Sequence, residues 1–193
     1  MSKAGAKRKL NPVEKADFEV ADRLVIDDDS VAGRALSGFA ELGDQPPLIA
    51  LSAGVFAFAL ASGNRRLART GLRMLAAHAV ATAFKGFIKD EVDRTRPGAA
   101  LEDKAYKLER GHSKDGGLRS MPSGHSAGLA AVARAAGREY PEIAVPAGLA
   151  AAAIAAAQLP SGNHFASDVA VGVGIGLASE AAVAGLMGPP QGR

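Results

Sequence analysis

The chain has 193 residues, a formal net charge of +3 and no cysteine, which suits one domain and excludes disulfides and thiolate metal sites. It contains 23 glycines, abundant alanine and no tryptophan, a composition typical of closely packed helices, so we expect an all-α fold. The charge is mild and no stripe of basic and aromatic residues accompanies it, which argues against a nucleic-acid partner.

The first 42 residues differ in composition from the rest of the chain. Residues 1–10 carry four cations without a following apolar run, which predicts a basic arm and not a cleaved signal peptide. Charges stay frequent up to residue 42, where Pro12 and the polar run 27–30 predict two amphipathic helices. We therefore divide the chain into an N-terminal segment, a main domain and a tail, at residues 1–42, 43–188 and 189–193.

Five apolar segments in the main domain predict five helices, at residues 45–64, 72–88, 120–133, 143–158 and 169–187. The first has no charged residue and is long enough to span a membrane. Four arginines follow it at 65–73, and the positive-inside tendency predicts that this short loop is cytoplasmic. The second segment carries Arg73, His78 and Lys85, which we expect on one polar stripe, with His78 as a packed or interfacial histidine.

The first motif, residues 89–97, places Lys89 and Arg96 seven residues apart. On a helix this spacing puts both cations on one face, roughly two turns apart, and Pro97 is expected to end that helix. Residues 98–119 are charged and contain glycines without a clear period. We expect this connection to form the rim of a functional site.

The second motif, residues 121–127, predicts the start of a helix, with Pro122 at its entry and Ser123 as its cap. The first N–H groups of a helix lack intrahelical partners and can donate to an anion, which the helix macrodipole also favours. Gly124 leaves the backbone open to close approach, and His125 then lies within reach of a bound phosphoryl group.

The third motif places His164 and Asp168 at i and i+4, so that Asp168 can accept a hydrogen bond from the imidazole. Gly172 and Gly176 follow as a G-x-x-x-G pair that allows close helix contact. With five helices, all three motifs fall at the end of the arrangement opposite the basic loop. A cationic pair, an anion-binding helix start and an oriented histidine are the parts of a phosphoryl-transfer site.

In this order, K-x6-RP, PSGH and H-x3-D resemble the three-part signature of the type 2 phosphatidic acid phosphatase superfamily, over residues 43–187. The resemblance implies a helical phosphatase in which His164 is the nucleophile, Asp168 orients its ring and His125 is the general acid. It also implies that no metal or cofactor is needed. The residues that it assigns to the phosphate oxygens are Lys89, Arg96, Ser123 and the Gly124 amide.

One position departs from the family pattern. Six residues before the histidine the family usually has an arginine, where this chain has Gln158. A neutral amide stabilises less negative charge than a guanidinium does. We expect either a weakened enzyme, with Gln158 as a neutral donor to the phosphate, or compensation by another arginine. Arg119 is the first candidate, and Arg94 is the second, although Arg94 should point away along the helix.

Several other functions remain open. A metallohydrolase could use His125, His164 and Asp168 as ligands. A vanadate-dependent haloperoxidase or a soluble acid phosphatase would belong to the same superfamily, and an inactive membrane scaffold would suit the missing arginine.

The motifs specify a phosphoryl group but not the molecule that carries it. A site at a membrane surface favours a lipid phosphate, for which undecaprenyl diphosphate, phosphatidic acid and phosphatidylglycerol phosphate remain open, the isoprenoid diphosphate first. We expect an integral protein of a bacterial inner membrane, with its site facing the periplasm. A soluble bundle is the alternative, because the mean hydropathy is only +0.06.

Overall fold

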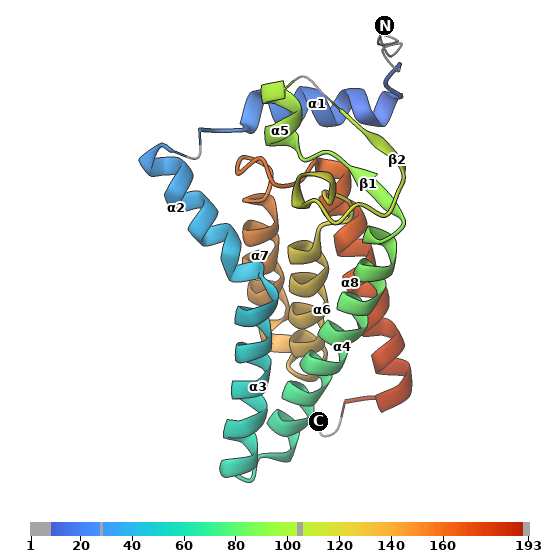
Figure 1. The fold of residues 1–193 in the computed structure, drawn as a ribbon. Coiled ribbons are helices and arrows are strands. Elements are labelled where there is room, and N and C mark those ends of the chain that lie inside the picture. The colour runs from blue at the N-terminus through green and yellow to red at the C-terminus, as the bar shows by residue number, and fades with distance from the viewer. Residues whose placement is uncertain (1–8, 28, 104–105, 191–193) are drawn as a thin grey trace, which may run out of the picture.

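The computed structural model describes residues 9–27, 29–103 and 106–190, and it is built around a bundle of five helices. Their bounds are α3, Gln45–Ala61; α4, Arg65–Lys89; α6, Gly124–Glu139; α7, Ala144–Ala156; and α8, Ala166–Met187. Helix α6 lies at the centre and contacts the other four, as Figure 1 shows. The expected all-α class with five apolar helices is therefore confirmed. The strands in the described residues are one short antiparallel pair, β1 (Val92–Arg94) and β2 (Leu108–Arg110).

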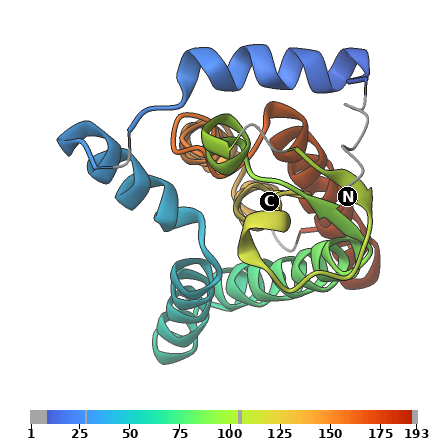
Figure 2. The same cartoon turned by 45° about the horizontal axis from the view of Figure 1, so that its top comes forward.

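Two amphipathic helices precede the bundle, as expected. Helix α1 (Pro12–Leu24) begins with a capping box in which Asn11 and Glu14 exchange hydrogen bonds, and α2 (Val31–Ala40) begins at the cap Ser30. Helix α1 lies across one end of the bundle, and α2 descends from it to α3 through the short helix Glu41–Gly43 (Figures 1 and 2). The predicted basic arm falls mostly in residues 1–8, outside the described part of the chain.

The first motif is not one continuous helix, and this corrects the sequence prediction. Helix α4 ends at Lys89, and β1 follows because residues 92–94 pair with β2 instead of extending the helix. Pro97 opens the short helix α5 (Pro97–Asp103) and does not end one. Lys89 and Arg96 therefore come from a helix end and a loop. The connection 98–119, expected to be irregular, holds α5, β2 and a turn of 3-10 helix at Gly116–Leu118.

Two further boundaries differ from the prediction. The arginines at 65–73 are not a loop, because the side chain of Asn64 caps α4 and the helix begins at Arg65. Helix α6 begins at Gly124, later than the predicted residue 120, and continues to Glu139, beyond the predicted end at residue 133. The predicted arrangement survives both changes: the α3–α4 turn lies at one end of the bundle, and β1, β2 and α5 lie at the other (Figure 1).

Helices α6 and α8 pack closely because glycines leave room between them. A Cβ on Gly176 would lie 2.3 Å from the Ala127 carbonyl oxygen, and one on Gly172 would lie 2.4 Å from the Ser123 carbonyl oxygen. Gly174, between them on α8, has nothing within 4 Å of the same position. The G-x-x-x-G pair is therefore the contact face, and it brings α8 against the start of α6.

The far end of the bundle is held by buried ions. The side chain of Arg73 is fully buried, 3.0 Å from an oxygen of Glu139 and 3.6 Å from an oxygen of Glu180. Arg69 and Arg138 add ion pairs to the same two carboxylates, which joins α4, α6 and α8. Arg73 thus faces the bundle interior. His78, further along α4, is also buried, as expected for a packed histidine.

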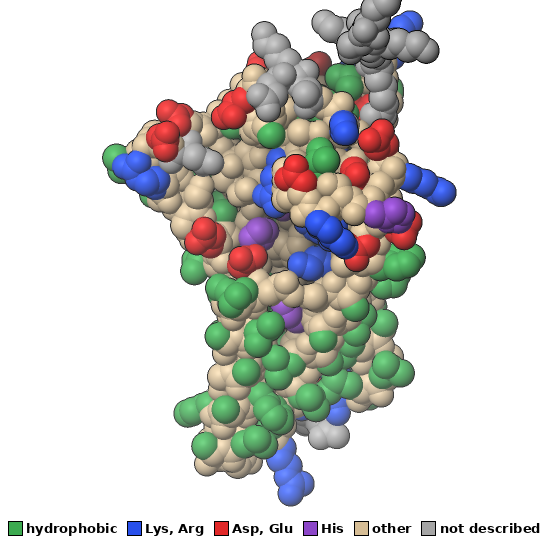
Figure 3. All heavy atoms as spheres, in the orientation of Figure 1, with side chains coloured by type: hydrophobic (Ala, Val, Ile, Leu, Met, Phe, Trp, Pro, Cys, Tyr) green, Lys and Arg blue, Asp and Glu red, His purple; other side chains and the backbone are tan. Residues whose placement is uncertain are grey.

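Large apolar side chains remain exposed around the middle of the bundle. They lie on α3, α4, α7 and α8 and include Leu51, Phe58, Leu60, Leu72, Phe84, Phe87, Val145, Leu149 and Leu186. Figure 3 shows hydrophobic side chains over α3 and α4, with the charged ones gathered toward the end where α1 lies. By length and composition, α8 could cross a membrane, and α2 with α3 could form a second span bent by 48°.

The glycine contact predicts a pair of variants with opposite outcomes. Gly176→Ala should destabilise the fold by about 1–3 kcal/mol, because the added methyl group meets the α6 backbone. Gly174→Ala, on the same helix, should be neutral or stabilising because alanine is the better helix former. Thermal unfolding of the two purified variants measures this difference. Equal unfolding temperatures would contradict the assigned contact face.

Candidate functional site

The three motifs meet at the end of the bundle that α1, α5 and the β1–β2 pair cover (Figure 1). His125 comes from the first turn of α6, and His164 comes from the loop that leads into α8. Their ring centroids are 5.9 Å apart. Two segments that are 39 positions apart in the sequence therefore bring two imidazoles next to each other, with their planes at 64°.

The start of α6 has the geometry of an anion-binding helix start. Ser123 is the cap, with a fully buried side chain whose oxygen accepts from the Ser126 hydroxyl at 2.9 Å and the Ser126 N–H at 3.3 Å. Gly124 is the first helical residue. The remaining N–H groups of this turn and the positive end of the helix point to the side where the histidines lie.

Lys85 reaches this helix start although no motif pointed to it. Its ammonium nitrogen lies 2.7 Å from the place that a Cβ of Gly124 would occupy, so glycine at this position is what admits the lysine. The signal in the sequence was its spacing, because Lys85 precedes Lys89 by four residues and shares a helix face with it. A primary amine beside the first N–H groups of α6 adds positive charge where an anion would bind.

Lys89 and Arg96, the cations of the first motif, are fixed by hydrogen bonds to uncharged groups. The Lys89 ammonium donates to the Arg119 carbonyl at 2.7 Å, and the Arg96 guanidinium donates to the Gly116 carbonyl at 2.9 Å and to Asn163 at 2.8 Å. These contacts hold both cations in place without neutralising their charges. Neither cation forms an ion pair with a carboxylate in the part of the chain that the structure describes, and such cations are suited to a phosphoryl group.

His164 is buried and its tautomer is set by the backbone. Its Nδ1 lies 2.7 Å from the Ser120 carbonyl oxygen, which can only accept, so Nδ1 carries the proton and Nε2 keeps its lone pair. Burial first, and then the positive charges of Lys89 and Arg96, hold the pKa of His164 well below 6.5. The imidazole is therefore neutral at pH 7, which is the form that a nucleophile needs.

Asp168 does not accept the predicted hydrogen bond from His164. Its carboxylate instead accepts from Arg94 at 2.6 Å, from the Ser120 hydroxyl at 2.6 Å and from the Phe165 N–H at 2.9 Å. The i and i+4 spacing does not bring the groups together because the helix begins only at Ala166, after the histidine. Asp168 is therefore linked to His164 through Ser120. The Ser120 hydroxyl donates to Asp168, and the Ser120 carbonyl accepts the hydrogen bond from the imidazole.

Arg94 was expected to point away from the site, and this is wrong. The residue lies in β1 and not on a helix, and its side chain is almost fully buried against Asp168, Asp17 and the Phe165 ring. Its guanidinium is committed to these contacts, so Arg94 holds Asp168 in place.

Gln158, which stands in place of the family's arginine, and Arg119, which was expected to compensate for it, both make other contacts. Gln158 is fully buried, and its amide donates to the Ala40 carbonyl at 2.9 Å, which ties the end of α2 to the loop after α7. The Arg119 guanidinium is paired with Asp90 and donates to the Ser113 carbonyl. Compensation by Arg119 and phosphate binding by Gln158 therefore lose support, and Lys85 is the better placed cation.

His125 has a partner that the motif did not indicate. Its Nε2 lies 3.1 Å from a carboxylate oxygen of Asp44, the residue that precedes α3.

The three residues that a metallohydrolase would use as ligands, His125, His164 and Asp168, do not form a metal site, because the Asp168 carboxylate is bonded to Arg94 and Ser120. Among the described residues, no three His, Cys, Asp or Glu side chains come together as a metal site.

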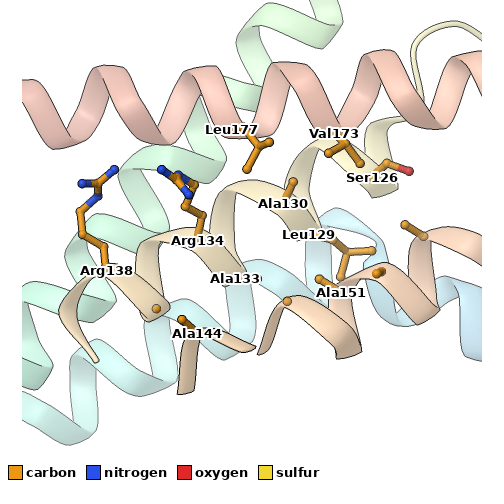
Figure 4. Close-up of a pocket in the computed structure, with 14 residues that line it drawn as sticks. Ser126, Leu129, Ala130, Ala133, Arg134, Arg138, Ala144, Ala151, Val173 and Leu177 are labelled. Carbon is orange, nitrogen blue, oxygen red and sulfur yellow. The ribbon is translucent and has the colours of Figure 1, made fainter. Parts of the chain in front are cut away.

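An apolar groove of about 390 Å³ begins beside this centre. It lies between α6, α7 and α8 and is lined mostly by alanine and glycine (Figure 4). Ser126, which donates to the cap Ser123, marks one end, and Arg134 and Arg138 mark the other (Figure 4). The groove therefore runs along α6 from the first turn of that helix toward the far end of the bundle.

Fold and site together define a helical protein with a histidine-based, anion-binding centre, and comparison with known proteins identifies its family. The model of the PAP2 superfamily matches residues 70–188, which is more than half of the chain, so the chain belongs to the PAP2 superfamily. The chain is accordingly assigned to the phosphatases, which are hydrolases of phosphate esters. No curated protein sequence matches the chain.

Two solved structures share the fold. The transmembrane PAP2 type phosphatidylglycerolphosphate phosphatase from Bacillus subtilis is 22% identical, with a TM-score of 0.64 over 92% of this chain and 87% of that one. Aquifex aeolicus LpxE is 20% identical, with a TM-score of 0.59 over 91% of this chain and 96% of that one. Both alignments extend over the N-terminal region that lies outside the family match.

The position of Lys85 predicts that it contributes to phosphate binding. Lys85→Met should lower kcat/KM for a phosphate ester by about tenfold or more, equivalent to about 1.4 kcal/mol per tenfold, whereas Lys85→Arg should retain most of it. Arg65→Met, at the opposite end of the same helix, is the matched control. Steady-state kinetics and the inhibition constant of inorganic phosphate measure the effect. Activity of Lys85→Met within twofold of wild type would contradict it.

Proposed function

We propose that this PAP2 protein hydrolyses a phosphorylated lipid through a phosphohistidine formed on His164. The observation that carries the proposal is the state of His164, a neutral, buried imidazole. Its Nδ1 donates to the Ser120 carbonyl, so Nε2 keeps its lone pair, and its ring centroid lies 5.9 Å from that of His125. The cations Lys85, Lys89 and Arg96 and the start of α6 surround the same space. A nucleophile, a second histidine and an anion-binding surface are thus combined at one point.

The geometry supports a two-step reaction. In the first step Nε2 of His164 attacks phosphorus, the bond between phosphorus and the leaving oxygen breaks, and His125 gives that oxygen its proton. In the second step His125 takes a proton from water, the water oxygen attacks phosphorus, and the phosphorus–nitrogen bond breaks to release inorganic phosphate. Asp44, beside Nε2 of His125, is placed to keep that ring oriented in both steps.

The non-bridging oxygens gain negative charge near the transition state and need fixed donors. Lys89 and Arg96 supply two charged donors, and the Ser123–Gly124 turn supplies backbone N–H groups and the helix dipole. Lys85 takes over the charge that an arginine at position 158 would provide. Because these groups are held by backbone carbonyls and neighbouring side chains, little reorganisation is required when the substrate reacts.

A lipid is the substrate class that the surroundings favour. The groove at Ser126 can take an apolar chain while the phosphate lies on the start of α6, and apolar side chains cover the outside of the bundle. Long-chain phosphate monoesters and isoprenoid diphosphates both fit this description. We infer that the bundle is integral to a bacterial inner membrane with the site at its periplasmic side, since the arginine-rich start of α4 lies at the opposite end.

The mechanism predicts activity without added divalent metal and inhibition by vanadate, which mimics five-coordinate phosphorus. His164→Ala should abolish turnover. His125→Ala should still release a good leaving group such as p-nitrophenol from its phosphate in a single turnover, because that group leaves without a proton. Phosphate release and rapid-quench detection of the phosphoenzyme measure these steps. An active His164→Ala variant, or activity lost in EDTA and restored by a metal, would contradict the mechanism.

The groove predicts chain-length discrimination. Gly148 lines the groove with nothing within 4 Å of its Cβ position, so a side chain can start there unobstructed and Gly148→Phe places a ring in the groove. It should lower kcat/KM for a long-chain lipid phosphate at least tenfold and leave a short, soluble phosphate ester within about twofold. Gly54→Phe on α3, equally unobstructed but outside the groove, is the control. Equal losses for both substrates would refute the groove as the chain site.

A further inference from the structure

We propose that Asp17 of α1 is a positioning residue for the catalytic centre, so that the N-terminal segment outside the family match is part of the working site. Asp17 lies far from the three motifs in the sequence, yet its side chain is only 4% exposed. It is buried against the start of α8 and against Arg94. The inference rests on the proposed function and adds a residue to it.

Asp17 supplies the cap that α8 lacks. The residue before α8 is Phe165, whose ring cannot accept a hydrogen bond from the helix N–H groups. An oxygen of Asp17 accepts the Ser167 N–H at 3.0 Å, and its other oxygen accepts the Ser167 hydroxyl. A carboxylate at this end of a helix is also favoured by the macrodipole. Helix α1 therefore holds the first turn of α8, which contains Asp168.

The second contact of Asp17 is with Arg94. Arg94 donates to Asp17 at 2.8 Å and to Asp168 at 2.6 Å, and all three side chains are at least 96% buried. One cation thus lies between two carboxylates, one from α1 and one from the first turn of α8. Since a buried guanidinium needs fixed partners, the direction in which Arg94 meets Asp168 depends on Asp17.

The contacts continue to the nucleophile without a break. Asp168 accepts a hydrogen bond from the Ser120 hydroxyl at 2.6 Å, and the Ser120 carbonyl accepts one from Nδ1 of His164 at 2.7 Å. Asp17 therefore influences the orientation of the His164 ring, and with it the direction of Nε2, through Arg94, Asp168 and Ser120. It touches neither the imidazole nor the place where the phosphoryl group would lie.

Aromatic packing keeps α1 in this position. Phe18, next to Asp17, packs on Tyr106 and Phe165 with ring centroids 5.0 and 5.2 Å away. The Tyr106 hydroxyl donates to Glu14, one turn before Phe18 on α1. Phe165 in turn directly follows His164. Helix α1 is thus held against the site by the packing of Phe18, while Asp17 makes the polar contacts with Arg94 and Ser167. A substitution of Asp17 therefore leaves the apolar attachment of α1 in place.

Asp17→Asn tests the proposal in the full-length protein, because it removes the charge at almost unchanged volume. The control is Asp22→Asn, an exposed carboxylate on the same helix. Activity is expressed per vanadate-binding site, so that a misfolded fraction does not count. The kcat of Asp17→Asn should fall by about tenfold or more while KM and the phosphate inhibition constant stay within about threefold, because binding groups are untouched and the nucleophile is misaligned. Asp22→Asn should match wild type.

A second comparison tests whether Asp17 acts through Arg94. In an Arg94→Gln background, Asp17→Asn should cause little further loss, because the chain of contacts is already broken. A kcat per site of Asp17→Asn within twofold of wild type, or fully additive losses in the double variant, overturns the inference. If Asp17→Asn fails to bind vanadate, Asp17→Glu is measured against the same criteria. Absence of hydrolysis by wild type would instead defeat the proposed function.

Discussion

A single buried guanidinium determines how the catalytic end of this protein is assembled. Arg94 is almost completely removed from water, and losing one partner of such a buried pair typically costs about 3–5 kcal/mol. The chain meets this demand with two carboxylates that are 151 positions apart, Asp17 and Asp168. Because both must reach the same cation, the N-terminal helix, the β1 strand and the start of α8 have little freedom to move relative to one another.

The rest of the bundle serves the same end by close helix packing. Gly172 lets the α8 backbone approach the carbonyl of Ser123, and the Ser123 N–H donates to the Asp168 carbonyl at 3.1 Å. The start of α6 and the first turn of α8 are therefore joined directly, not through intervening side chains. At the other end, the buried ions around Arg73 hold α4, α6 and α8 together, which keeps the frame rigid where no chemistry takes place.

Sequence reasoning was most successful for features that are local. Helix count, the cap at Ser123 and the contact face at Gly172 and Gly176 follow from spacing and residue type, which act over a few positions. It failed where a partner comes from a distant segment. The pairing of β1 with β2 replaced the predicted helix through Arg96, and that change reversed the expected direction of Arg94.

The sequence by itself determined the residue types of the site and the end of the bundle at which they meet, because charges, glycines and apolar runs specify helices and their ends locally. Only the tertiary structure decided what each polar group contacts. It directs Asp168 to Arg94 and Ser120 instead of His164, commits Gln158 to the Ala40 carbonyl, and brings Lys85 to Gly124. Hydrogen-bond partners of buried groups are set by whichever segments pack around them, and that packing is a property of the whole chain.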